Sequence, residues 1–153
     1  MAVTLERLLV PTDFGPASAK AINYASSFAK ILGAELHLLN VVSHPHIDSE
    51  AQESWVEPQQ TRMSKNIQSA EVQLDAEIGR CGVPFERVQK HVQLGSPVRE
   101  ILKYAQNNRI DLIVMGTQGR KGFANFVIGS VAEQVVQQAS CPVLTVHPEN
   151  SIV

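Results

Sequence analysis

The strongest constraint on this fold is a repeated alternation between short apolar runs and longer stretches with helical spacing. Three apolar runs end at Pro11, Val42 and Gly116, and a last one covers 143–146. Between them, apolar residues recur at steps of three and four, the period of a helix with one buried face. Strands that alternate with helices form parallel sheets, because each parallel pair needs a crossover connection. The sequence therefore predicts an α/β domain with an open parallel sheet.

Start and stop residues place the individual elements. Gly33 suits a left-handed helix stop, and Ser96 is suited to cap a helix that begins at Pro97. The run over 85–94 alternates imperfectly, which is typical of a strand at a sheet edge. The predicted strands end at Pro11 or cover 36–42, 85–94, 111–116 and 143–146; the predicted helices cover 16–32, 63–78, 97–107 and 130–139. The segment 43–60 has no period and is predicted to be a loop.

Length and composition narrow the class of protein. The 153 residues suit one domain over 1–153, and 44% hydrophobic with 18% charged residues is too apolar for a disordered chain. The net charge of −2 does not favour nucleic-acid binding, and no apolar run approaches the ~20 residues of a membrane span. Glu6 and Arg7 interrupt the region where a signal peptide would be apolar, so a cytoplasmic location is expected. Cys81 and Cys141 stand apart and indicate neither a disulfide framework nor a zinc site.

Two loop-to-helix junctions carry the candidate ligand site. Ligands of open parallel sheets bind beyond the carboxyl ends of the strands, where the strand order reverses. Asp13 follows the first strand and is placed to accept hydrogen bonds from ribose hydroxyls. Gly116 and Gly119 follow the fourth strand, and Gly129-Ser130 open the last helix. Glycines let a backbone approach an anion, and helix N-termini attract one, so these residues predict phosphate binding, with Arg120 and Lys121 adding positive charge.

Each of these residues also has a purely structural interpretation. The string is neither a Walker A loop nor the dinucleotide GxGxxG. Gly116 can simply end a strand, and Gly129 can simply let the last helix pack closely. Ser130 suits a helix N-cap, and Asp13 suits a turn residue that hydrogen-bonds to its own loop. The ligand-binding and structural interpretations are compatible for Ser130 and stay open for the others.

The spacing GxxG, nine residues, then Gly-Ser, formed by Gly116, Gly119, Gly129 and Ser130, resembles the nucleotide-binding signature of the universal stress protein family. Further similar segments lie at 9–14, 33–42, 111–117 and 140–146. The resemblance implies a Rossmann-like sheet of order 3-2-1-4-5 with helices on both faces. It also implies ATP in the switch-point crevice and a role in the stress response. The sequence does not separate ATP from AMP or ADP, and Mg²⁺ or Mn²⁺ is expected to accompany the phosphates.

The resemblance assigns further site residues by matching position. It places Asp13 at the ribose or the adenine, and Pro11, Thr12 and Val41 beside the base. It places these residues around the ribose and phosphates: Met115, Gly116, Gly119, Gly129, Ser130 and Val131. The chain departs from the family at Asn125-Phe126, a stretch that is often basic, so the preferred number of phosphates stays open.

The residues favour a binding module over a dedicated enzyme. No Ser/His/Asp order is convincing, no carboxylates are paired, and Cys141 lacks a recognisable base. His44 and His46 lack the further ligands of a metal site. The apolar last strand, Val143 to Val146, would expose an unpaired edge, which together with the resemblance predicts a homodimer joined through that strand. A slow ATP hydrolase or phosphotransferase and a nucleotide-free dimeric scaffold are the alternatives.

Overall fold

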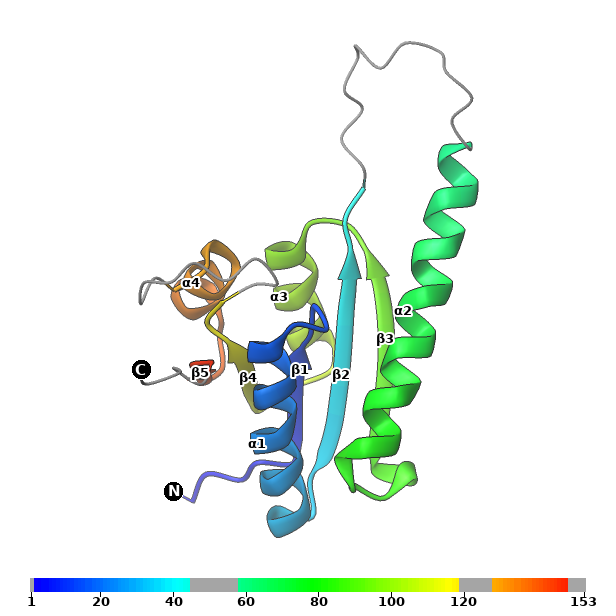
Figure 1. Ribbon diagram of the computed structural model, residues 1–153. Coiled ribbons are helices and arrows are strands. Elements are labelled where there is room, and N and C mark those ends of the chain that lie inside the picture. The colour runs from blue at the N-terminus through cyan, green and yellow to red at the C-terminus, as the bar shows by residue number, and fades with distance from the viewer. Residues whose placement is uncertain (1, 45–57, 119–127, 149–153) are drawn as a thin grey trace, which may run out of the picture.

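The computed structural model describes residues 2–44, 58–118 and 128–148, and it contains the predicted parallel sheet (Figure 1). Its strand order is β3-β2-β1-β4-β5, and every neighbouring pair is parallel. The strands are β1 (Arg7–Pro11), β2 (Glu35–Val42), β3 (Val88–Leu94), β4 (Leu112–Gly116) and β5 (Val143–Val146). The predicted order 3-2-1-4-5 is confirmed.

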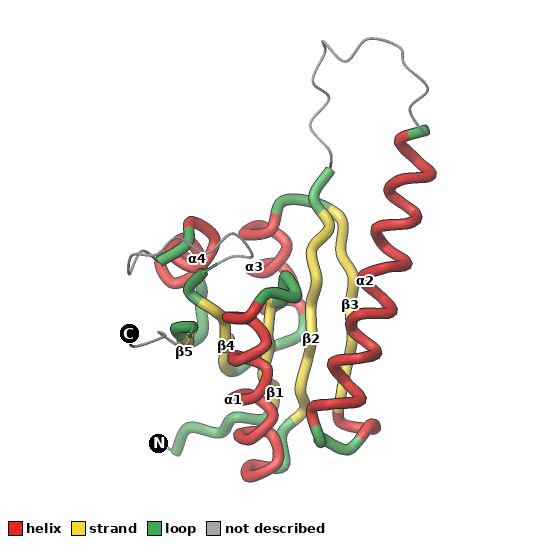
Figure 2. Tube along the Cα trace, viewed as in Figure 1, coloured by secondary structure: helices red, strands yellow, loops and turns green. Residues whose placement is uncertain are grey.

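In the described part of the chain, four α-helices connect the strands. They cover both faces of the sheet, as Figures 1 and 2 show. They are α1 (Pro16–Leu32), α2 (Gln59–Cys81), α3 (Pro97–Asn107) and α4 (Ser130–Gln138). Helices α1 and α2 pack on one face, while α3 and α4 pack on the other. No helix within the described ranges has the length and hydropathy needed to cross a bilayer.

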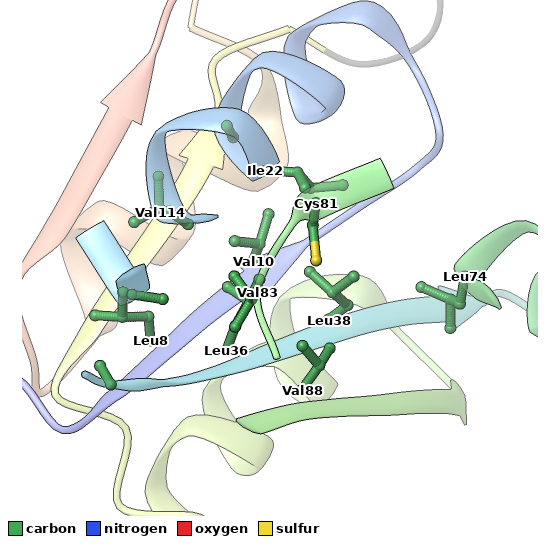
Figure 3. Packing of buried hydrophobic residues seen from close by; sticks show 14 of the residues in the cluster. Leu8, Val10, Ile22, Leu36, Leu38, Leu74, Cys81, Val83, Val88 and Val114 are labelled. Atoms are coloured by element: carbon green, nitrogen blue, oxygen red, sulfur yellow. The ribbon is translucent and has the colours of Figure 1, made fainter. Parts of the chain in front are cut away.

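Alternation along the strands produces two apolar cores. Leu8 and Val10 face α1 and α2, whereas Leu9 between them faces α3 and α4. Both faces are covered, so neighbouring strand residues are all buried, which explains the continuous apolar runs in the sequence. Figure 3 shows the first core, in which Leu36 and Leu38 of β2 belong to one cluster with Leu74 of α2 and Leu38 lies nearer to Leu74.

The helix ends follow from local chemistry. Gly33 and Gly82 end α1 and α2 in the left-handed conformation, each with φ of 70°. Arg87 strengthens the first of these ends, because its guanidinium donates to the carbonyl oxygens of Ala29 at 3.1 Å and Ala34 at 3.3 Å. A cation at a helix C-terminus also opposes the negative end of the helix dipole. The predicted stop at Gly33 is confirmed.

Helix α2 extends beyond the predicted 63–78 at both ends, so residues 59–60 of the predicted loop are helical. Two further local predictions are wrong. The residues Phe85–Arg87 form a turn of 3₁₀-helix, because the N–H of Arg87 bonds back to the carbonyl of Pro84, so the edge strand begins only at Val88. Ser96 does precede α3, but its side chain makes no capping hydrogen bond. Since Ser96 is exposed, water can reach the first-turn N–H groups and the hydroxyl is not needed there.

Candidate functional site

The candidate site lies at the carboxyl edge of the sheet, between the ends of β1 and β4. Strand β1 has β2 on one side and β4 on the other, so the strand order reverses here. Helix α1 follows β1 onto one face, and α4 follows β4 onto the opposite face. Connections that leave two neighbouring strands toward opposite faces open a crevice between them, which is the usual ligand position in such sheets.

The turn from β1 into α1 is held tightly in place. The N–H of Thr12 donates to the carbonyl of Leu39 at 2.8 Å, and the side-chain amide of Asn40 donates to the carbonyl of Thr12 at 2.8 Å. Phe14 adopts the left-handed backbone conformation with φ of 63°, which is uncommon for a bulky residue. Its N–H is held by the Thr12 hydroxyl at 3.0 Å. Such a conformation persists only where its surroundings enforce it.

Asp13 combines a structural role with a free acceptor. Its Oδ1 accepts hydrogen bonds from the N–H of Gly15 at 2.9 Å and from the hydroxyl of Ser18 at 2.8 Å. The interpretation of Asp13 as a turn residue is therefore confirmed for this oxygen. Its Oδ2 accepts no hydrogen bond from the described residues. One oxygen fixes the carboxylate, and the other is available to a ligand.

Gly116 lets α1 approach the end of β4. A Cβ at this position would lie 2.7 Å from the Cβ of Ala17, 2.8 Å from its carbonyl carbon and 3.0 Å from the backbone nitrogen of Ser18. These distances are well below ordinary van der Waals contact. Gly116 therefore does more than end a strand: it brings the first turn of α1, which carries Ser18, against β4.

Thr117 joins the start of α4 to the end of β4. Its N–H donates to the carbonyl of Val146 at 3.0 Å, and its own carbonyl accepts a hydrogen bond from the N–H of Gly129. Gly129 is the N-cap of α4, and Ser130 is the first helical residue, so Ser130 is not the cap. No side chain of the described residues caps α4, which leaves its first-turn N–H groups available to an anion. Glu133 places a carboxylate in the same turn.

The apolar residues predicted for the site lie on strands that end at this edge, except Val131, which lies in the first turn of α4. Met115 is buried in the core under α3 and α4, and Val41 and Val131 pack against the same core. Pro11 is buried at the end of β1, where it pairs with Leu39 of β2. The predicted residues Gly119 and Arg120, like Lys121, lie outside the described ranges.

The structure adds three polar residues that the sequence analysis did not select: Ser18, Asn40 and Thr117. All three are buried, with exposed fractions of 4%, 8% and 2%. Asn40 interrupts an otherwise apolar strand, and Ser18 occupies the buried face of α1, so each stands as a polar residue on an apolar pattern. That mismatch was a usable signal, because buried polar groups need hydrogen-bond partners.

Titratable groups elsewhere in the molecule are engaged in packing. His37 of β2 is buried, with Nδ1 2.8 Å from the Tyr104 hydroxyl and Nε2 3.3 Å from Glu35 Oε2. Burial lowers the pKa of His37, against the opposing effect of Glu35, and raises the pKa of Tyr104. Burial also raises the pKa of the Cys141 thiol, which disfavours the reactive thiolate. Within the described residues, no three His, Cys, Asp or Glu side chains gather to hold a metal ion.

The strand order, with its reversal at β1, and the helices on both faces define a doubly wound α/β protein. The profile of the Universal stress protein family matches residues 4–147, so the chain belongs to that family. Universal stress protein MJ0531 of Methanocaldococcus jannaschii is 33% identical over 142 residues, which cover 92% of this chain and 81% of that protein. Universal stress protein YxiE of Bacillus subtilis is 29% identical over 148 residues, which cover 92% of this chain and 98% of that protein.

Solved structures share the fold. The structure of MJ0577 from Methanocaldococcus jannaschii superposes with a TM-score of 0.81 at 26% identity, covering 97% of this chain and 100% of that one. The universal stress protein UspA from Lactobacillus plantarum gives a TM-score of 0.70 at 24% identity, and the superposition covers 95% of this chain and 99% of that one. The sheet order and the arrangement of the helices are thus those of the family.

Proposed function

We propose that this chain is an adenine-nucleotide-binding regulatory protein of the stress response, with ATP bound at the carboxyl edge between β1 and β4. The observation that carries the proposal is the convergence of two helix starts on one edge. Gly116 brings the start of α1 against β4, and the hydrogen bond from Gly129 to Thr117 brings the start of α4 to the same strand. The proposal uses Asp13 as the acceptor for the sugar and the first-turn N–H groups of α4 as the donors for the phosphates, at the same edge of the sheet.

The two ends of a nucleotide match these two helix starts. The free Oδ2 of Asp13 suits a ribose, because ribose hydroxyls donate hydrogen bonds and a carboxylate accepts them. The first-turn N–H groups of α4 suit phosphates, because they carry the positive end of the helix dipole. A Mg²⁺ or Mn²⁺ ion would be held by the phosphates of the bound ATP.

The ligand class draws support from two proteins of the same fold. One universal stress protein was solved in complex with cAMP, at 20% identity and a TM-score of 0.66. Another, from Archaeoglobus fulgidus, was solved in complex with dAMP, at 16% identity and a TM-score of 0.61. Both ligands are adenine nucleotides. At these identities the likeness concerns the fold, and the assignment of ATP to this chain rests on its own crevice.

The proposal includes a homodimer joined through β5 and a cytoplasmic location. Strand β5 pairs with β4, and no described strand pairs with its other edge. Leu144 at that edge is 37% exposed. Pairing with a second copy would satisfy the free backbone groups and cover this side chain. A bound nucleotide would then shift the population toward the loop or interface conformation that it binds more tightly.

The test exchanges one exposed residue at the start of α4. Ser130→Asp adds a negative charge where phosphates are expected, while Ser130→Asn adds a side chain of the same size without charge. An acidic residue in the first turn stabilises a helix by about 0.3–1 kcal/mol, so lost binding in the Asp variant would not reflect unfolding. Repulsion between charges should weaken ATP binding about tenfold or more in Ser130→Asp, and little in Ser130→Asn.

The measurement is isothermal titration calorimetry with ATP, ADP and AMP, after release and mass identification of any nucleotide that co-purifies. Binding that falls in Ser130→Asp and survives in Ser130→Asn supports the proposal. A parent protein that carries no nucleotide and shows no heat of binding with millimolar ATP and Mg²⁺ would refute it. Multiple turnover of ATP by the parent protein would instead favour the alternative of a hydrolase.

A further inference from the structure

Ser18 is a buried serine in the first turn of α1, at the junction between the helix and the candidate site. It is 4% exposed and lies next to Gly116, whose missing Cβ leaves room for it. Its hydroxyl lies 2.8 Å from Asp13 Oδ1, 3.1 Å from the carbonyl of Gly15 and 3.2 Å from the Thr12 hydroxyl. A buried hydroxyl with this many polar neighbours belongs to a network, which determines where its single proton goes.

The direction of the hydrogen bonds in this network follows from chemistry. The Asp13 carboxylate and the Gly15 carbonyl both only accept, and the single proton of Ser18 goes to the carboxylate, because it is charged and lies closer, at 2.8 Å against 3.1 Å. The lone pairs of Ser18 then accept the proton of Thr12, and Thr12 accepts the N–H of Phe14. The result is a directed chain from Phe14 through two hydroxyls to Asp13 Oδ1. Chains of this kind strengthen each member by polarisation.

The chain immobilises one carboxylate oxygen and leaves the other unused. Oδ1 is held by Ser18 and by the N–H of Gly15, two donors that approach from the turn and the helix. Oδ2 accepts no hydrogen bond in the described part of the chain. The orientation of the Asp13 carboxylate is therefore set before any ligand arrives. Because the carboxylate is already ordered, a ligand that donates to Oδ2 does not incur the entropic cost of ordering this side chain.

We propose that Ser18, with Thr12 behind it, is a positioning residue that holds the Asp13 carboxylate ready for the hydroxyls of a ribose and so makes the site selective for ribonucleotides. The inference rests on the proposed nucleotide site and adds its specificity. Ser18 touches no ligand in this account. Its effect on affinity passes through Asp13 alone and is confined to ligands that carry the sugar hydroxyls.

The test compares ATP with 2′,3′-dideoxy-ATP, which lacks both hydroxyls. Ser18→Ala removes the donor to Asp13 without disturbing the helix, because alanine is a strong helix former. We expect the affinity for ATP to fall roughly three- to tenfold, because one charge-assisted hydrogen bond no longer orders the Asp13 carboxylate. The affinity for the dideoxy ligand should stay within about twofold of the parent value. Thr12→Val, which removes the hydroxyl behind Ser18, should give a smaller change in the same direction.

Ser26 provides the matched control. It is a buried serine on the same face of α1, and its hydroxyl has no partner among the described residues, so Ser26→Ala should leave both affinities unchanged. Calorimetry on the four proteins gives the ratio of the two affinities for each. A parent protein that binds both ligands equally, or a Ser18→Ala variant that weakens both equally or neither, overturns the inference while leaving nucleotide binding intact. A parent that binds neither ligand overturns the proposed function as well.

Discussion

The contact between Gly116 and α1 makes a quantitative prediction about stability. In Gly116→Ala, the new Cβ would lie 2.7 Å from the Ala17 Cβ and 3.0 Å from the Ser18 nitrogen. Carbon atoms normally approach to about 3.5–4.0 Å, so α1 or β4 must shift by about 1 Å. Two of the three opposing atoms belong to the backbone, which has no rotamer to change.

The expected loss of stability follows from two opposing effects. Forcing an extra methyl group into a tightly packed site costs about 1–3 kcal/mol. Replacing glycine by alanine also restricts the unfolded chain, which returns about 0.4–1 kcal/mol. The net expectation is a loss of about 1–2 kcal/mol in the free energy of unfolding. With a urea dependence of about 2 kcal/mol per molar, the midpoint should fall by about 0.5–1 M.

Gly79 supplies the control on the same chain. It lies inside α2, it is exposed, and a Cβ built there meets nothing within 4 Å. The identical substitution should therefore raise stability by about 0.5–1 kcal/mol, because glycine is unfavourable in a helix interior. Urea denaturation followed by circular dichroism on both variants gives the two shifts. Opposite signs are expected, and a Gly116→Ala midpoint at or above the parent value would refute the packing argument.

Two further predictions concern the edge strand and the buried histidine. Leu144→Lys should shift the protein from dimer to monomer in analytical ultracentrifugation, because a charge at the free edge of β5 opposes pairing, whereas Val72→Lys on the exposed surface of α2 should leave the mass unchanged. Burial lowers the pKa of His37, so the unfolded chain binds its proton more readily. The stability that neutral His37 contributes is complete above about pH 6.5 and is lost as the pH falls below it.

The pH effect is tested through its slope. The groups that face His37 are Glu35, which favours its protonation, Arg7 and His91, which oppose it, and the Tyr104 hydroxyl, which bonds to it. His37→Gln removes the titrating ring, so the fall in stability between about pH 7 and pH 5 should become shallower. A dimer that survives Leu144→Lys would argue against the β5 interface, and an unchanged pH slope in His37→Gln would argue against the buried imidazole as its source.

Much of the fold was predictable because both sheet faces are buried. Burial on two sides makes the inner strands continuously apolar, so their ends could be placed within a residue or two. The error at Phe85–Arg87 has the opposite cause: this segment lies at a sheet edge, where Phe85 is 78% exposed and burial imposes no pattern. The capping error at Ser96 arose because an exposed hydroxyl competes with water for the same N–H groups.

The site was predictable in part. The glycines and Asp13 stood out because their types are unusual at the end of a strand, and the resemblance to a family gave them roles. Ser18 and Asn40 did not stand out in the sequence, because their importance depends on which groups lie opposite them in the folded chain. The direction of a hydrogen-bonded chain such as that from Thr12 to Asp13 appears only when the atoms are placed.

The sequence by itself determined the order of strands and helices, the stop at Gly33, and the family. These features depend on local chemistry and on hydrophobic period, which act over a few residues. The tertiary structure alone decided that Gly116 must lack a side chain, because the obstacle is the start of α1, about a hundred residues earlier in the chain. It also decided that Asp13 uses one carboxylate oxygen for its own turn and keeps the other free, since that division depends on donors that only folding brings within reach.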